Sequence, residues 1–146
     1  MNGFKYFFEQ TTEQEENIKK TLSKIPKKHS ALIKGYKIKW QCDNVLDGDD
    51  GHVGVIDPNN KTITIAAPYR FSREHVFLHE LAHKIWAHFM TPELVKKWKI
   101  VLKNTKNKPN QNAEELWCHS YATYYSKNRV EKFNIPTWMK FIEKLK

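Results

Sequence analysis

The H-E-x-x-H pattern at residues 79–83 constrains this 146-residue chain more than any other stretch. On a helix, residues four apart lie on one face, so His79 and His83 can direct both imidazoles at one metal ion. Glu80, one position along, is then placed to act as a general base beside that metal. The surrounding residues 72–89 have the composition of a single helix with a capping serine at its start.

The rest of this predicted motif helix is apolar, which indicates that the helix is buried. Large and small hydrophobic side chains fill most of its remaining surface: Val76, Phe77, Leu78, Leu81, Ala82, Ile85, Trp86 and Phe89. A buried histidine or glutamate is costly unless it is hydrogen-bonded or bound to a metal. The setting therefore favours a metal site over two unrelated surface histidines. His75, one turn before His79, could line the mouth of the cleft, but we expect it to be solvated.

A third metal ligand is expected on the helix predicted over residues 111–128. Catalytic zinc sites usually use three protein ligands and leave one position for water. Glu115 is the preferred third ligand, because the residues three, four and seven positions after it are small or polar. Glu114, which shares its face with aromatic residues, is the alternative. The interval between His83 and Glu115 leaves room for one intervening helix and a linker.

The order of predicted elements indicates one α+β domain over residues 1–146. Alternating apolar and polar residues predict a strand over residues 36–42. Two β-branched runs, at residues 52–56 and 62–66, are joined by a turn and predict a hairpin. With the strand at 36–42, this gives a small antiparallel three-stranded sheet packed on the motif helix. The predicted segments are an N-terminal helical part (1–35), the sheet (36–67), the motif helix (72–89), and helices at 91–104, 111–128 and 136–145.

Composition indicates what kind of core, cell compartment and partners to expect for this protein. The chain is 40% hydrophobic and has only two cysteines, so we expect a packed core without a disulfide framework. Without a long apolar run or a signal peptide, we expect a cytoplasmic protein with no membrane partner. The net charge of +9 comes without a block of consecutive basic residues, which favours a solvated lysine-rich surface over a nucleic-acid partner. The Asp/Gly-rich loop at residues 43–51 lacks the spacing of a calcium loop.

At this point the chain resembles a known group of enzymes. Residues 77–83, with Glu115 followed by Tyr121 and Ala122, are similar to the gluzincins, which are zincin-type metallopeptidases with a glutamate as third ligand. The resemblance is to the compact ImmA/IrrE-like group and to the lethal-factor-like and ArdC-type metallopeptidase domains, and it covers roughly residues 52–126. The resemblance implies a minimal zincin-like fold and an enzyme that hydrolyses a peptide bond in a protein substrate. Members of the group are often carried by phages and mobile elements.

The resemblance also implies site residues. His79, His83 and Glu115 would bind one Zn²⁺, and Glu80 would be the catalytic base. The chain departs from the compact group at residues 116–119, and it has Lys108 where lethal-factor-like enzymes carry a tyrosine. The group that faces Glu80 across the metal is therefore left unassigned.

Two further residues are candidates for supporting roles. His119, one turn after Glu115, can orient a ligand, stabilise an oxyanion or pack in the core. Tyr121 can stabilise an oxyanion or pack in the core. An extended substrate is expected to pair with an exposed strand edge, for which the predicted strand at residues 62–66 is the candidate.

Two other functions fit parts of the sequence. The first is a basic nucleic-acid-associated protein with a non-catalytic metal site, suggested by the net charge of +9. The second is a metal-dependent amidase or deformylase, since deformylases also use H-E-x-x-H. Their upstream cysteine ligand lies in a glycine-containing motif, which the surroundings of Cys42 do not resemble. Nothing in the sequence indicates the oligomeric state.

Overall fold

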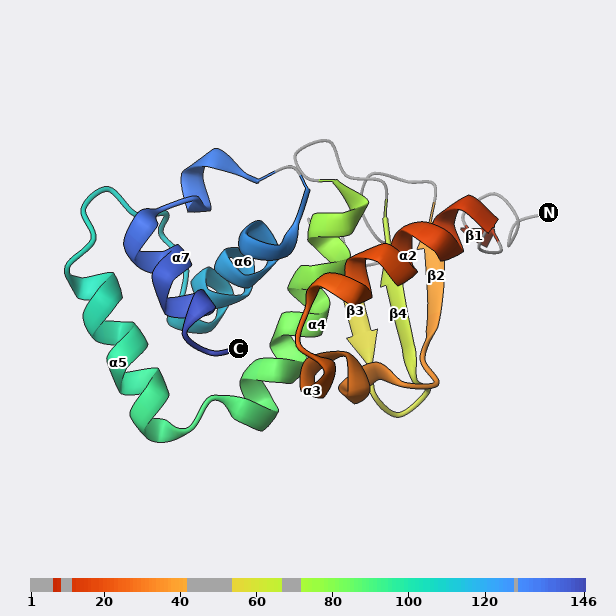
Figure 1. Cartoon of the computed structure of the whole chain (residues 1–146), viewed down its shortest axis with the longest axis horizontal. Coiled ribbons are helices and arrows are strands. Elements are labelled where there is room, and N and C mark those ends of the chain that lie inside the picture. The colour runs from red at the N-terminus through yellow and green to blue at the C-terminus, as the bar shows by residue number, and fades with distance from the viewer. Residues whose placement is uncertain (1–6, 9–11, 42–53, 67–71, 128) are drawn as a thin grey trace.

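The computed structural model describes residues 7–8, 12–41, 54–66, 72–127 and 129–146. Helix α4 lies in the middle of the molecule (Figure 1). The sheet, α2 and α3 lie on one side of α4, and the C-terminal helices α5 to α7 lie on the other. The elements are β1 (Phe7–Phe8), α2 (Thr12–Lys24), α3 (Lys27–Ser30), β2 (Lys37–Gln41), β3 (Gly54–Asp57), β4 (Thr62–Ile65), α4 (Arg73–Phe89), α5 (Pro92–Lys103), α6 (Ala113–Tyr125) and α7 (Pro136–Glu143), with short 3-10 helices at Ala31–Ile33 and Glu131–Phe133. The predicted α+β class is confirmed.

The sheet is mixed, with strand order β1-β2-β4-β3. β3 and β4 form the predicted antiparallel hairpin, in which Ile56 lies opposite Ile63. β2 runs parallel to β4, with Ile38 opposite Ile63, so the prediction of an all-antiparallel sheet is wrong for this pair. The two-residue β1 adds a short antiparallel strand beside β2.

Strand order also overturns the predicted substrate edge. β4 is hydrogen-bonded on both sides, so it cannot receive a further strand, and β3 is the edge of the described sheet beyond it. Alternation of apolar residues identifies which face of a strand is buried, but it is the same for parallel and antiparallel partners. The predicted loop at residues 43–51, and the predicted strand ends at residues 42 and 52–53, lie outside the described residues.

A side chain fixes the turn of the β3–β4 hairpin. The Asp57 carboxylate accepts hydrogen bonds from the backbone N–H groups of Asn59, at 3.0 Å, and Asn60, at 3.3 Å. Lys61 then adopts a positive φ of 50°, which completes the reversal. This turn chemistry holds the strands in register and carries β4 toward the start of α4.

Helix α4 forms where the motif helix is expected. The Ser72 hydroxyl accepts a hydrogen bond from the His75 backbone N–H at 3.0 Å, which caps the first turn. Leu78, Leu81 and Ala82 are fully buried. The helix ends before Thr91, whose side chain caps α5 in turn. In the described part of the chain, no helix is both long and apolar enough to cross a membrane.

Trp98 and Trp138, which join the C-terminal helices, both have a hydrogen-bond partner for the indole N–H. Trp98 of α5 donates to the Ala113 carbonyl at the start of α6, at 2.8 Å. Trp138 of α7 donates to the Thr105 hydroxyl at 2.9 Å and meets Trp98 edge-on, with ring centroids 5.5 Å apart. These contacts fix the first turn of α6, the helix that supplies the candidate third metal ligand.

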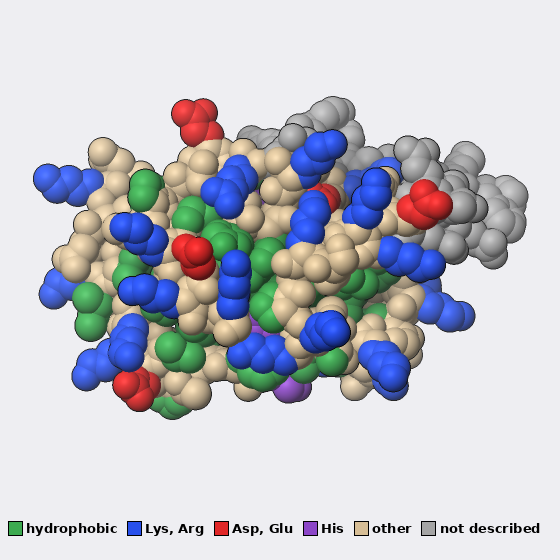
Figure 2. Space-filling view, viewed as in Figure 1, with side chains coloured by type: hydrophobic (Ala, Val, Ile, Leu, Met, Phe, Trp, Pro, Cys, Tyr) green, Lys and Arg blue, Asp and Glu red, His purple; other side chains and the backbone are tan. Residues whose placement is uncertain are grey.

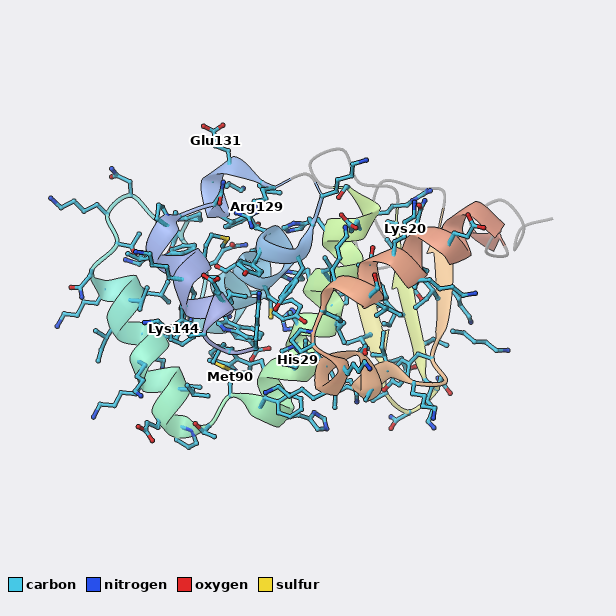
Figure 3. The ribbon with its side chains drawn as sticks, in the orientation of Figure 1. Lys20, His29, Met90, Arg129, Glu131 and Lys144 are labelled. Carbon is cyan, nitrogen blue, oxygen red and sulfur yellow. The ribbon has the colours of Figure 1, made fainter. Side chains whose placement is uncertain are left out.

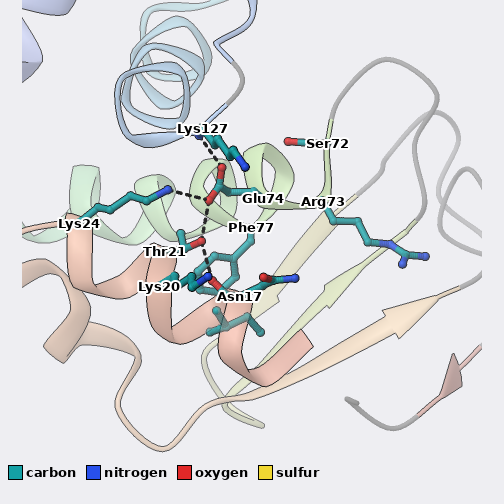
Figure 4. A pocket seen from close by; sticks show the side chains of 10 residues that line it. Asn17, Lys20, Thr21, Lys24, Ser72, Arg73, Glu74, Phe77 and Lys127 are labelled. Atoms are coloured by element: carbon teal, nitrogen blue, oxygen red, sulfur yellow. Dashed lines mark hydrogen bonds and ion pairs between the residues drawn. The ribbon is translucent and has the colours of Figure 1, made fainter. Parts of the chain in front are cut away.

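Glu74, in the first turn of α4, ties three parts of the fold together (Figure 4). Its carboxylate accepts hydrogen bonds from the Thr21 hydroxyl at 2.7 Å and from the Lys127 backbone N–H at 2.6 Å. It also pairs with Lys24 at 3.3 Å. Burial acts to raise the pKa of Glu74, but these donors together hold it below its usual value. The charged carboxylate therefore joins α2, α4 and the end of α6.

We expect Glu74→Ala to lower the free energy of unfolding by about 1–3 kcal/mol, because partly buried donors lose their acceptor. Urea denaturation measures this change. Glu93→Ala is the matched control, because Glu93 forms an exposed pair with Lys97 at 3.5 Å on the surface of α5. Equal stability of the two variants would show that the Glu74 contacts do not hold the fold together.

Candidate metal centre

Two imidazoles on α4 point at the same spot. His79 and His83 are one helical turn apart, and their Nε2 atoms lie 3.2 Å from each other. The two rings meet edge-on, with centroids 4.8 Å apart. His79 is largely buried, whereas the side chain of His83 is partly open to solvent. The paired Nε2 atoms therefore face a position that solvent can reach from the His83 side.

Glu115 brings a carboxylate to the same spot from α6. The Asn112 side chain caps this helix by accepting the Glu115 backbone N–H at 2.8 Å. The two Glu115 oxygens lie 3.1 Å from His79 Nε2 and 3.0 Å from His83 Nε2. The structure thus places the three predicted ligands, His79, His83 and Glu115, with their donor atoms together.

The donor set and its spacing fit a zinc ion. Two nitrogens and a carboxylate oxygen are common zinc ligands, and tetrahedral ligands about 2.0–2.1 Å from zinc lie about 3.3 Å apart. The three pairwise distances of 3.0–3.2 Å are close to this value. Three protein groups also leave one position open. His79, His83 and Glu115 therefore form a group that could hold a metal ion.

In the cluster itself, a positively charged histidine offsets the negative charge of the glutamates. Burial acts to lower the pKa of His83, but hydrogen bonds to Glu115 and Glu114 raise it to about 9. Hydrogen bonds from His79 and His83 hold the pKa of Glu115 well below its usual range. His83 is thus protonated at neutral pH in the metal-free protein. A metal must displace that proton, so metal affinity falls as the pH falls.

Glu114, the alternative third ligand, contacts the other nitrogen of His83. The His83 Nδ1–H donates to Glu114 Oε2 at 2.6 Å. When a metal displaces the Nε2 proton, this bond keeps the remaining proton on Nδ1, and a carboxylate in this place raises the basicity of the imidazole. Sequence reasoning missed this role. Adjacent residues on a helix project about 100° apart. Glu115 can therefore face the two Nε2 atoms while Glu114 reaches the far side of the His83 ring.

His119 lies behind His79, in the interior. Its ring stacks on Phe133 with centroids 4.2 Å apart, and it is 4.1 Å from the ring of His79. Its Nδ1 is 3.0 Å from Nε2 of His75. Among the roles expected for His119, these contacts support packing in the core, between Phe133 and His79.

His75 is buried at 1% exposure, so the expectation that it is solvated is wrong. It belongs to the apolar side of α4, and its pairing with His119 satisfies a ring nitrogen there. Burial lowers the pKa of His75 to about 3 and that of His119 to about 2. Both imidazoles are neutral.

Tyr121 points away from the metal ligands. Its hydroxyl lies 3.0 Å from Nδ1 of His29, which comes from α3 near the C-terminal end of α4 (Figure 3). Burial raises the pKa of Tyr121 above its usual range. Six positions after Glu115 correspond to a rotation of about 240° around a helix, so the two side chains leave α6 in different directions. The geometry supports core packing for Tyr121 and not an oxyanion role.

Comparison with known proteins adds no assignment: no protein-family profile, curated protein or solved structure matches this chain. The site therefore has to be judged on its own residues.

We expect Glu114→Ala to weaken zinc binding about 10- to 100-fold, because His83 loses the carboxylate that orients it. Competition with a chromophoric chelator measures the affinity. Glu131→Ala is the control, since Glu131 is exposed and projects outward from the body of the protein (Figure 3). Unchanged affinity in Glu114→Ala would show that the contact with His83 does not support the site.

Proposed function

We propose that this chain is a zinc-dependent metallopeptidase with a minimal zincin-like fold. The observation that carries the proposal is the convergence of His79, His83 and Glu115 within hydrogen-bond distance, with Glu80 next to His79 on the same helix. The resemblance to gluzincins rests on these same residues. Hydrolysis of a peptide bond in a protein substrate, as in phage and mobile-element peptidases of that type, is the reaction that accounts for all four.

His79, His83 and Glu115 would hold the zinc ion. When bound, zinc makes a water molecule more acidic and polarises a carbonyl group. Glu80 then has the role of general base: it accepts a proton from the attacking water and passes it to the amine that leaves. Glu80 is partly exposed, and its charge contributes to the raised pKa of His83, so it stands beside the ligands and within reach of solvent.

The start of β3 supports the position of Glu80. A methyl group at Gly54 would lie 2.9 Å from Cγ and 3.2 Å from Oε2 of Glu80, and 2.7 Å from Cγ1 of Val76. Only glycine leaves room for the α4 side chains here. Because β3 is one of the two edge strands of the described sheet, its outer side can receive an extended peptide that pairs with the backbone next to Glu80. This edge replaces β4 as the proposed place for the substrate.

Rival functions have weaker support. Lys and Arg side chains are scattered over the face shown in Figure 2 and do not gather in one stripe, which fits a solvated surface better than a nucleic-acid site. A deformylase would use a cysteine as third ligand. The described Cys118 groups with His83 and Glu114, whereas the group that contains both motif histidines and a carboxylate uses Glu115.

Glu80→Gln should retain zinc but lose about 10²- to 10⁴-fold in peptide hydrolysis, because the amide cannot accept the proton. Zinc content is measured by elemental analysis, and cleavage by mass spectrometry of a mixed peptide library. Glu93→Gln on α5 serves as the control and should behave like the wild type. A Glu80→Gln enzyme with unchanged turnover would rule out this mechanism.

Gly54→Ala should reduce hydrolysis roughly 10- to 100-fold at unchanged zinc content, because the added methyl group displaces Glu80 or pushes β3 away from α4. The peptide-library assay and elemental analysis separate the two effects. Ile100→Ala is the control, because Ile100 is 52% exposed on α5, outside the proposed site. Full activity in Gly54→Ala would show that the close approach to Glu80 has no functional role.

A further inference from the structure

A second group of nitrogen donors lies next to the candidate metal centre. His75, His79 and His119 place one ring nitrogen each within 4.8 Å of one another. They come from neighbouring turns of α4 and from α6, and all three are buried, at 1%, 9% and 7% exposure. This group shares only His79 with the group formed by His79, His83 and Glu115.

The shared residue has a second ring nitrogen that the first group does not use. His79 Nε2 lies 3.1 Å from Glu115 and 3.2 Å from His83. His79 Nδ1 is on the opposite part of the ring and is buried without a hydrogen-bond partner. A buried polar atom with no partner is rare in proteins and calls for a ligand or a strained arrangement. The ring of His119 lies beside the ring of His79, with centroids 4.1 Å apart.

The other two donors are arranged as ligands of one ion would be. His75 Nε2 and His119 Nδ1 lie 3.0 Å apart, close to the spacing of about 3.3 Å between ligands of tetrahedral zinc. The stack of His119 on Phe133, with planes inclined by 3°, holds that ring in place. Neutral imidazole is the form that binds metals, and imidazole suits zinc, copper and nickel.

We propose that His75, His119 and Nδ1 of His79 form a second metal site, for a divalent ion of the zinc type. His79 bridges the two sites as an imidazolate. On binding, His79 releases its ring proton to solvent. His75 and His119 stay neutral. The proton that lies between His75 Nε2 and His119 Nδ1 before binding moves to a ring nitrogen that faces away from the ion, so each ring keeps one proton. The second site does not depend on peptidase activity, and it joins α4 to α6 behind the first site.

Native mass spectrometry of the full chain after zinc loading and removal of excess metal tests this proposal. We expect about two zinc ions in the wild type, about one in His75→Phe and about one in Glu115→Ala. His88→Ala is the control and should keep both ions, since His88 is exposed on the same helix and its ring hydrogen-bonds the Lys84 carbonyl within its own helical turn. Circular dichroism checks folding, and His119→Phe, which retains the ring stacked on Phe133, replaces His75→Phe if that variant does not fold.

The outcomes separate the two sites. A single ion that is lost in Glu115→Ala but kept in His75→Phe would overturn the second site and leave the proposed function standing. A single ion with the opposite behaviour would support the second site and refute the first. Two ions that both persist in His75→Phe and His119→Phe would also overturn the proposal. Loading with copper adds a further measurement, because a bridging imidazolate couples the spins of the two ions in the electron paramagnetic resonance spectrum.

Discussion

The packing of α4 against α6 is the contact on which the rest of this structure depends. Leu78 and Leu81 of α4, and Leu116 and Ala122 of α6, are buried at 0–1% exposure. Each large apolar side chain buried in this way contributes about 1.5–3 kcal/mol. The same packing holds Glu115 about 3 Å from two histidines, although bringing these polar groups together out of water is costly. Apolar burial thus offsets the cost of assembling the site, and the site in turn satisfies the polar groups within it.

The two motif histidines are supported differently. His83 has the carboxylate of Glu114 on its Nδ1, which favours a basic Nε2 and a fixed ring. His79 instead has the neutral ring of His119 beside it, and His75 beyond. A neighbouring negative charge therefore orients His83, whereas packing against neutral rings holds His79 in place. Glu80, Glu114 and Glu115 supply the negative charge around the centre, which suits a divalent cation.

How well the sequence predicts this molecule depends on whether the relevant signal is local. Ser72 and Asn112 are capping residues that can be recognised in the sequence, and α4 and α6 start beside them. The face of α6 that carries Glu115 follows from its neighbours three, four and seven positions on. The direction of β2 relative to β4 has no such signal, because it depends on the path of the chain between them. The pairing of Glu114 with His83, and the burial of His75, involve another helix, so periodicity within one helix does not reveal them.

The sequence by itself determines the α+β class, the helix that carries H-E-x-x-H and a short list of carboxylates for the third position. These follow from helical periodicity, capping and composition, which act within a few residues of one another. Tertiary structure alone decides which carboxylate meets both histidines, which edge of the sheet is open, and that His119 and His75 lie behind His79. The contacts between α4 and α6 join residues more than thirty positions apart, and β2 pairs with β4 across 25 positions. They are decided by how α4, α6 and the sheet pack, because this packing must bury the apolar faces of all three elements together.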